Sequence, residues 1–457
     1  MANKTEDRSA ERSGGGWSTE GLGYLQDQEA KQRVYVVHPF MRDRADTSHL
    51  KRSPEARLAE AMGLAEAIDV ELVGGEIIAM RERRPATLIG TGKIEELKEF
   101  VKEHEIDLLV FDCELSPGQQ RNLERETKTK VIDRTALILE IFGARASTKE
   151  GELQVELAHL EYQRSRLVRS WTHLERQRGG SGFMGGPGET QIEADRRIIA
   201  DRITRIKRQL EQVTKTRTLH RAGRQKAPYP IVALVGYTNA GKSTLFNRLT
   251  KAEVLAEDML FATLDPTMRA VELDGGRRII LSDTVGFISE LPTTLVAAFR
   301  ATLEEVCEAD LIVHVRDASH PDTEIQKLDV EAVLGELGVE LVEEGEGTPF
   351  VEALNKIDLM PQDERDALVT LDARVPRTVA ISGLTGDGCD RLLEAIDLTL
   401  SSADMRLKVE VPYSDGATQA WLHANSRIVV EEHREKAVYY EVYVDPVAWA
   451  KYKSRQR

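Results

Sequence analysis

The 457-residue sequence predicts an α/β protein built around a doubly wound, mostly parallel sheet. Two observations lead to this fold class. Short apolar runs typical of buried strands alternate with helical patterns, and glycine-rich or polar loops follow several of these strands. A third observation, two long apolar stripes at heptad spacing in the middle of the chain, adds a helical hairpin.

The chain divides where its composition or periodicity changes. Residues 1–30 are rich in glycine, serine and charge, and they predict a disordered tail. The expected units that follow are a small α/β unit at 31–150, a helical hairpin at 151–226 with a glycine-rich tip at 179–188, the main α/β domain at 229–402 and a small α+β domain at 403–457.

Composition excludes several classes of protein. The formal net charge is −15, with 77 Asp and Glu against 62 Lys and Arg, which argues against a surface that coats nucleic acid uniformly. The three cysteines, Cys113, Cys307 and Cys389, form no CxxC pair and fit free thiols in a reducing compartment. No apolar run approaches the roughly 18 residues of a membrane span. We therefore expect a cytoplasmic protein.

The first α/β unit predicts strands over 33–37, 69–73 and 106–111, with helices over 54–67 and 93–103 between them. Strands that alternate with helices pair in parallel. The run Gly90–Lys93 is too short for a phosphate loop, so we expect a structural role, with a second nucleotide site in 31–150 as the alternative.

Two apolar stripes cover residues 152–220. The first consists of Leu153, Leu157, Leu160, Leu167, Trp171 and Leu174, and the second of Ile192, Ile199, Ile203, Ile206, Leu210 and Val213. The 179–188 segment between them contains six glycines, which break both helices. The pattern predicts an antiparallel hairpin with arms of about 30 Å, at about 1.5 Å per residue.

The strand pattern Ile231–Val235 leads directly into GYTNAGKS at 236–243 and then into a helical run. In this G-x-x-x-x-G-K-S pattern, glycines let successive backbone N–H groups point at phosphates beside a helix N-terminus. We expect Lys242 to contact the β- and γ-phosphates and Ser243 to give its hydroxyl to Mg²⁺. The domain at 229–402 is therefore predicted to be a P-loop domain; a simple glycine-rich turn is the alternative.

A second motif, Asp283–Gly286, follows the strand pattern at 278–282. Its acidic residue is placed to hold Mg²⁺ through water, and the Gly286 N–H is placed to reach the γ-phosphate. Between these motifs, Phe261–Thr267 needs a hydroxyl that completes the Mg²⁺ shell. Thr263 is our choice and Thr267 the alternative. Such a segment is ordered by the triphosphate and released after hydrolysis, which predicts a switch.

Two further motifs identify the base. Asn355–Asp358 follows the strand pattern at 350–354, and the Asp358 carboxylate accepts from both N1–H and N2–H₂ of guanine, a donor pair that adenine lacks. We expect Asn355 on the Hoogsteen edge and Lys356 along the ring plane. Ser382–Leu384 follows the strand pattern at 378–381 and offers a backbone N–H to guanine O6. All four motifs end strands of one sheet, where open α/β sheets bind ligands, so GTP is the predicted substrate.

The candidate catalytic residues are Lys242, Thr263 and Gly286, and the candidate Mg²⁺ residues are Ser243, Thr263 and, through water, Asp283. The expected nucleotide contacts are Gly236, Tyr237, Thr238, Asn239, Ala240, Gly241, Lys242, Ser243, Phe261, Ala262, Thr263, Leu264, Asp265, Asp283, Thr284, Val285, Gly286, Asn355, Lys356, Ile357, Asp358, Ser382, Gly383 and Leu384. Phe287 stands where many switch GTPases carry a glutamine that orients water. We therefore expect slow intrinsic hydrolysis, accelerated by a partner or a monovalent cation.

Basic charge gathers in the hairpin. Residues 151–230 contain 16 Lys and Arg against 9 Asp and Glu, in a chain that is acidic overall. A basic rod with a glycine tip favours RNA as a partner, the alternative being a solvated coiled-coil surface. The arginines available for phosphate contacts are Arg164, Arg166, Arg169, Arg176, Arg178, Arg196, Arg197, Arg202, Arg205 and Arg208. At the tip, Gly180 and Gly182 permit insertion into a narrow site, and Phe183 is suited to stack on a base.

Four segments carry a resemblance to a known family: Leu115–Glu124, Asp133–Phe142, Pro187–Arg197 and Phe261–Thr267. Together with the motifs above, they resemble the HflX family of translational GTPases, in the Obg/Era-related group, over about residues 33–457. It implies binding to the large ribosomal subunit, GTP hydrolysis stimulated by that subunit, and splitting or rescue of stalled ribosomes. By analogy with potassium-dependent GTPases that this chain resembles, Asn239 is a candidate K⁺ ligand; a turn-forming asparagine is the alternative.

We therefore expect a Mg²⁺-dependent GTPase that binds the large ribosomal subunit and its RNA as a monomer. Its GTP state is expected to control binding, and hydrolysis to control release. Two alternatives stay open: a GTPase that assembles the large subunit, and an RNA-remodelling module whose hydrolysis is incidental.

Overall fold

The structure is a computed structural model of the chain. It describes residues 31–42, 52–177, 187–224, 229–251, 260–261, 267–289, 303–342, 347–402, 405–444 and 449–453, except for the single positions 275, 304, 373, 374, 376 and 451. No helix within these ranges has the length and apolar character needed to span a bilayer.

The N-terminal unit has a parallel four-stranded sheet in the order β2-β1-β3-β4. Its elements are β1 (Arg33–Met41), α1 (Pro54–Glu66), β2 (Glu71–Met80), α2 (Thr91–Glu103), β3 (Leu108–Phe111), α3 (Pro117–Thr127), β4 (Lys130–Asp133) and α4 (Arg134–Arg145). Val34 and Val36 of β1 face one apolar cluster, while Tyr35 and Val37 face another. Both faces of the sheet are therefore covered, as parallel sheets require.

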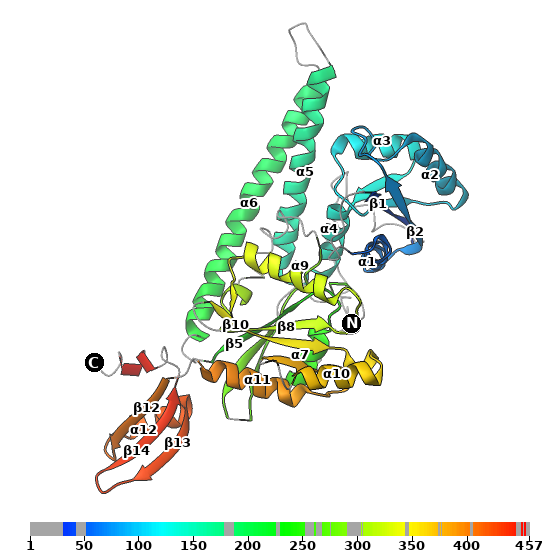
Figure 1. Cartoon of the computed structure of the whole chain (residues 1–457). Helices are drawn as coiled ribbons and strands as arrows, with labels where there is room; N and C mark the ends of the chain where they lie inside the picture. Colours follow the sequence, from blue (N-terminus) through cyan, green and yellow to red (C-terminus); the bar gives the residue numbers. More distant parts are fainter. Residues whose placement is uncertain are drawn as a thin grey trace, which may run out of the picture.

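Helices α5 (Lys149–Gln177) and α6 (Pro187–Arg224) form the hairpin, which projects away from the rest of the molecule (Figure 1). Leu153, Leu157 and Leu160 pack against Ile203 and Ile206, so the expected pairing of the two stripes is confirmed where side chains are described. The helices have 29 and 38 residues. At about 1.5 Å per residue they are roughly 44 and 57 Å long, so the expected 30 Å was too short.

The tip also differs from expectation at its C-terminal end. Helix α6 begins at Pro187, inside the segment 179–188 that was predicted to break both helices. Proline suits the first turn of a helix because its missing N–H has no intrahelical partner there. Residues 178–186 lie outside the described part of the chain.

Helix α5 has a second buried face that the heptad pattern did not predict. Val155 and Ala158 join the apolar cluster that contains α4. The Tyr162 hydroxyl donates to the Asp133 carboxylate at 2.8 Å, and Arg166 pairs with the same carboxylate. The base of the hairpin is therefore attached to the N-terminal unit as well as to its own second arm.

The main domain has a sheet in the order β11-β10-β8-β5-β7-β6, in which only the β6–β7 pair is antiparallel, with β9 parallel to β10. Its elements are β5 (Ile231–Gly236), α7 (Lys242–Thr250), β6 (Thr267–Glu272), β7 (Arg278–Asp283), β8 (Leu311–Asp317), α9 (Thr323–Glu336), β9 (Leu341–Val342), β10 (Thr348–Asn355), the 3₁₀ helix η1 (Ile357–Leu359), α10 (Gln362–Asp372), β11 (Thr378–Ala380) and α11 (Cys389–Ser402). Helices lie on both sides of this sheet, so the predicted doubly wound fold is confirmed (Figure 1).

The C-terminal part is an antiparallel sheet in the order β12-β14-β13 with a helix, α12, packed against it. Its elements are β12 (Met405–Pro412), α12 (Gly416–Asn425), β13 (Ser426–His433) and β14 (Ala437–Val444). This agrees with the expected α+β class, although no helix was specifically located at 416–425.

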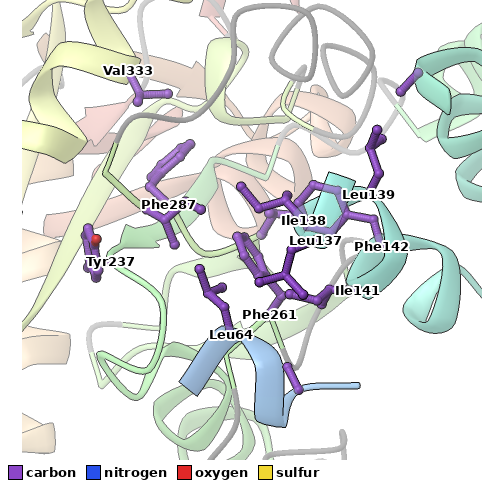
Figure 2. Packing of buried hydrophobic residues seen from close by; sticks show 14 of the residues in the cluster. Leu64, Leu137, Ile138, Leu139, Ile141, Phe142, Tyr237, Phe261, Phe287 and Val333 are labelled. Carbon is purple, nitrogen blue, oxygen red and sulfur yellow. The ribbon is translucent and has the colours of Figure 1, made fainter. Parts of the chain in front are cut away.

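One apolar cluster crosses from the N-terminal unit into the main domain. Leu64 of α1 and Phe142 of α4 lie beside Phe261 and Phe287 of the main domain (Figure 2). The rings of Phe142 and Phe261 meet edge to face, with centroids 4.7 Å apart. The two units therefore share a continuous core at the side of the sheet where the phosphate motifs lie.

Glu140 on α4 makes stability depend on pH. Burial raises the pKa of its carboxyl to about 7, and no charged group among the described residues offsets this shift. Since the unfolded carboxyl ionises near pH 4.5, the folded state loses stability as pH rises from about 4.5 to 7. We expect Glu140→Gln to stabilise the protein at pH 8 by on the order of 2 kcal/mol and to have little effect near pH 4.5.

Thermal melts of Glu140→Gln at both pH values test this expectation. Glu99→Gln on the exposed face of α2 removes the same charge without the burial and serves as the control. Equal midpoints for Glu140→Gln and the unchanged protein at pH 8 would show that the Glu140 carboxylate is hydrated in the folded state.

Candidate nucleotide site

The phosphate loop connects β5 to α7 in a conformation that two glycines permit. Gly241 has φ +87°, and a Cβ on it would lie 2.3 Å from Asn355 Nδ2. A Cβ on Gly236 would lie 2.1 Å from the carbonyl oxygen of Val315. Gly241 also brings no capping side chain to the start of α7. The first N–H groups of this helix are therefore open to an anionic group.

Lys242 is a buried ammonium group at the start of α7, 6% exposed. Its Nζ donates to the carbonyl oxygens of Gly236 at 3.2 Å and Tyr237 at 2.8 Å. Burial lowers its pKa to about 8, and among the described residues no carboxylate lies within ion-pair distance of it. A buried cation without an ion pair fits a site that receives phosphate.

The two candidate Mg²⁺ residues that the structure describes lie together. The Ser243 hydroxyl donates to Asp283 Oδ2 at 2.7 Å, across the ends of β7 and α7. Oxygen donors of this kind fit Mg²⁺. Thr238 Oγ1, in the phosphate loop, is also buried and has no hydrogen-bond partner in the described structure. The Thr284 hydroxyl, in contrast, donates to the carbonyl oxygen of Leu234 at 2.6 Å. It therefore connects the residue after β7 to β5.

The expected switch threonine lies outside the described residues, as do Ala262, Leu264 and Asp265. Phe261 is described: it is 2% exposed and packs in the interdomain core rather than toward the phosphate loop. The alternative residue, Thr267, begins β6 and pairs with Asp283 in the antiparallel ladder. The backbone pairing of Thr267 leaves its hydroxyl unassigned, so Thr263 as the switch residue stays a prediction.

Gly286 lies directly against the phosphate loop. A Cβ on it would lie 2.8 Å from Thr238 Cγ2 and 3.1 Å from Lys242 Nζ. The next residue, Phe287, donates its N–H to Gly236 at 3.1 Å and accepts from Thr238 N–H at 2.7 Å. Its side chain is 1% exposed and packs in the interdomain core (Figure 2). Phe287 therefore anchors this segment, and its buried side chain is not available to orient a water molecule at the phosphate side.

Asn355 connects the phosphate loop to the loop after β11, where the Ser382–Leu384 motif lies. Its Nδ2 donates to the carbonyl of Ala240 at 2.8 Å, and its Oδ1 accepts from Gly383 N–H at 2.8 Å. This bridging role was not foreseen, because the expected task of Asn355 was a contact with the base. The short η1 helix carries Asp358 beside Ile357, whose N–H donates to Ile381 at 3.3 Å. Asp358 is therefore held beside the end of β11.

We call the segments 355–358 and 382–384 the loop cluster. Two further residues hold these segments in place, and sequence reasoning missed both. Asp317, which ends β8, pairs with Lys356 Nζ at 2.9 Å. Arg248 of α7 donates from Nε to the carbonyl of Gly383 at 2.8 Å and also to that of Leu384. The signal for Asp317 was available, since it is an acidic residue at the end of an apolar strand pattern.

We expect Arg248→Ala to weaken guanine nucleotide binding by about tenfold, the effect of losing charge-assisted hydrogen bonds that hold the loop. Titration with a fluorescent GDP analogue measures this affinity. Arg269→Ala, at an exposed position on β6, is the control and should bind normally. If Arg248→Ala binds GDP as tightly as the control, the loop holds its position without Arg248.

The candidate RNA residues are only partly described. Arg178, Gly180, Gly182 and Phe183 lie outside the described residues, whereas Arg196 and Arg197 are exposed on α6. Arg166 was wrongly included among the phosphate-binding arginines, because it pairs with Asp133 and donates to Leu115 at 3.2 Å. Arg202 pairs with Glu156 across the hairpin at 2.5 Å.

Comparison with protein families assigns three consecutive parts of the chain. Residues 55–143 match a model described as GTP-binding GTPase N-terminal, residues 145–224 match the GTP-binding GTPase middle region, and residues 231–356 match a 50S ribosome-binding GTPase. These matches cover most of the described chain and follow the order of its structural units.

Individual relatives extend over most of the chain. A protein of Magnetococcus marinus named GTPase HflX is 52% identical over 372 residues, covering 81% of this chain and 84% of the relative. The GTPase HflX of Escherichia coli is 42% identical, covering 85% of this chain and 87% of the relative. Among solved structures, a GTP-binding protein from Sulfolobus solfataricus in complex with GDP is 24% identical with a TM-score of 0.42, covering 81% of this chain and 99% of that one.

Proposed function

Since this chain belongs to the HflX family of GTPases and therefore hydrolyses GTP, we propose that it binds the large ribosomal subunit and splits or rescues stalled ribosomes. The observation that carries the proposal is the match of residues 231–356 to a 50S ribosome-binding GTPase model. The hairpin supplies a suitable second element, because exposed Arg196 and Arg197 lie on a helix that extends away from the nucleotide domain.

In this proposal the nucleotide state sets the affinity for the ribosome. GTP favours the bound conformation and GDP weakens it, each by its differential affinity for the two conformations. Ser243, Asp283 through water and Thr263 would hold Mg²⁺, which would neutralise charge on the β- and γ-phosphates. Lys242 and the first N–H groups of α7 orient the phosphates. The protein acts in the cytoplasm as a monomer.

Potassium is a second proposed cofactor. Asn239 has φ +60°, a left-handed conformation within the phosphate loop, and we propose that its side chain contributes to a K⁺ site. Hydrolysis rates in K⁺ and Na⁺ at equal ionic strength test this part alone. Identical rates would exclude K⁺ as a cofactor without affecting the rest of the proposal.

The decisive experiment incubates stalled ribosomes with the protein and either GTP or a non-hydrolysable analogue, and separates subunits on a gradient. Splitting with both nucleotides would show that hydrolysis serves release. Deletion of residues 179–188 should leave intrinsic GTP hydrolysis intact and remove splitting. If that deletion still splits ribosomes, the hairpin has no part in the reaction; if the full protein splits none, an assembly or RNA-remodelling role replaces this proposal.

A further inference from the structure

A buried polar cluster joins the N-terminal unit to the phosphate loop and to the residues after Gly286. We call it the interdomain cluster and define it as Arg52, Glu60, Arg134, Tyr237 and Ser289. Arg52, Glu60 and Arg134 come from the N-terminal unit, and their side chains are 5%, 11% and 7% exposed. Tyr237 is the second residue of the phosphate loop, and Ser289 is the third residue after Gly286.

The hydroxyl of Tyr237 is the centre of this cluster. It donates to the Glu60 carboxylate and accepts from Arg52 Nη1 and from Ser289 N–H, each of the latter at 2.8 Å. Burial and the Glu60 carboxylate raise the pKa of Tyr237, so the hydroxyl keeps its proton. One donated and two accepted bonds use the full capacity of a phenol hydroxyl. Its position is therefore set from three directions.

Arg134 holds the same segment from the other side. Its Nη2 donates to the carbonyl of Ser289 at 3.0 Å and to Glu60 Oε1 at 2.6 Å. Its Nη1 donates to Asp112 at 2.5 Å, and Asp112 in turn contacts His38 Nδ1 at 2.8 Å. The guanidinium is thus oriented by the end of the N-terminal sheet before it reaches Ser289.

These contacts fix backbone that takes part in the reaction. Ser289 lies close in sequence to Phe287, whose backbone is hydrogen-bonded to Gly236 and Thr238 of the phosphate loop. Figure 2 shows Phe287 and Tyr237 in the apolar cluster that Leu64 and the α4 side chains complete. Gly286, whose N–H must meet the γ-phosphate, is therefore held between two fixed points.

We propose that Glu60 and Arg134 are positioning residues for GTP hydrolysis, which act through the Tyr237 hydroxyl and the Ser289 backbone to hold Gly286 against the phosphate loop. The N-terminal unit thereby completes the hydrolytic site without touching the nucleotide. The inference concerns hydrolysis by the isolated protein and is independent of the ribosomal proposal.

Tyr237→Phe tests the proposal, because it removes the hydroxyl and keeps the ring in the core. Loss of its hydrogen bonds should lower kcat for GTP by at least about fivefold. The dissociation constant for GDP should stay within about twofold, since the phosphate-binding backbone is unchanged. Tyr35→Phe makes the same change at a tyrosine of the N-terminal unit that is 9% exposed and lies outside the interdomain cluster, and both constants should remain those of the unchanged protein.

A double-mutant cycle that combines Tyr237→Phe with Glu60→Gln tests whether Glu60 acts through the Tyr237 hydroxyl. If Glu60 acts through Tyr237, the double variant should be within about twofold of the slower single variant. Three outcomes overturn the proposal: an unchanged or raised kcat in Tyr237→Phe, a GDP affinity that falls in proportion to kcat, or effects that multiply in the double variant. Should Glu60→Gln fail to fold, as a circular dichroism melt would reveal, the kcat of Tyr237→Phe decides alone.

Discussion

Gly286→Ala should abolish most GTP hydrolysis while leaving GDP binding nearly intact. A Cβ at this position would lie 2.9 Å from Thr238 Cα, which is backbone and cannot move aside as a flexible side chain would. The substitution therefore moves the N–H of residue 286 away from the position at which we expect it to meet the γ-phosphate. We expect kcat to fall on the order of 100-fold, the scale seen when one preorganised donor is lost.

Single-turnover hydrolysis and GDP titration measure the two effects separately. Gly335→Ala is the matched control, because a Cβ there meets nothing within 4 Å. Hydrolysis by Gly286→Ala at more than about a third of the control rate would show that this N–H does not contact the transferred phosphate.

Asp358→Asn should change the base that the protein selects. A carboxylate accepts both the N1–H and the N2–H₂ of guanine, whereas an amide offers one acceptor and one donor. Xanthine, with N1–H and a carbonyl at C2, matches the amide. We expect GDP affinity to fall on the order of 100-fold or more, because a polar site then faces an unmatched group, and xanthosine diphosphate to become the better ligand.

Competition binding with guanosine and xanthosine diphosphates tests this expectation. Asp363→Asn, at the exposed start of α10, makes the same chemical change outside the loop cluster and should keep the guanine preference. A guanine preference that survives Asp358→Asn would assign base selection to the backbone of Ser382–Leu384 instead.

The sequence predicted those parts of the molecule that depend on local pattern. The strand at Ile231–Gly236, its glycine loop and the helix that starts at Lys242 form one continuous signal, and the structure confirms the fold that they predict. The paired stripes of the hairpin were predictable for the same reason. The apolar residues of each stripe repeat at helical spacing, and those of α5, such as Leu157, share one buried cluster with those of α6, such as Ile206.

The sequence could not predict contacts between distant segments. Nothing local distinguishes Glu60 from other glutamates, yet it lies 177 positions from the Tyr237 hydroxyl that it binds. Arg166 was assigned to RNA because it lies in a basic helix, and only the packing of α5 on the N-terminal unit shows that Asp133 pairs with it. From the sequence, Phe287 indicated only that a water-orienting glutamine is absent from this position. Its burial shows that it is also a core residue.

The most direct test of the account is the affinity of the pure protein for isolated large ribosomal subunits, measured with a non-hydrolysable GTP analogue and with GDP. We expect binding at least about tenfold tighter with the GTP analogue, which corresponds to a coupling free energy of roughly 1.4 kcal/mol or more between the two sites. Equal affinity with the two nucleotides would contradict the central claim that the bound nucleotide controls engagement with the ribosome.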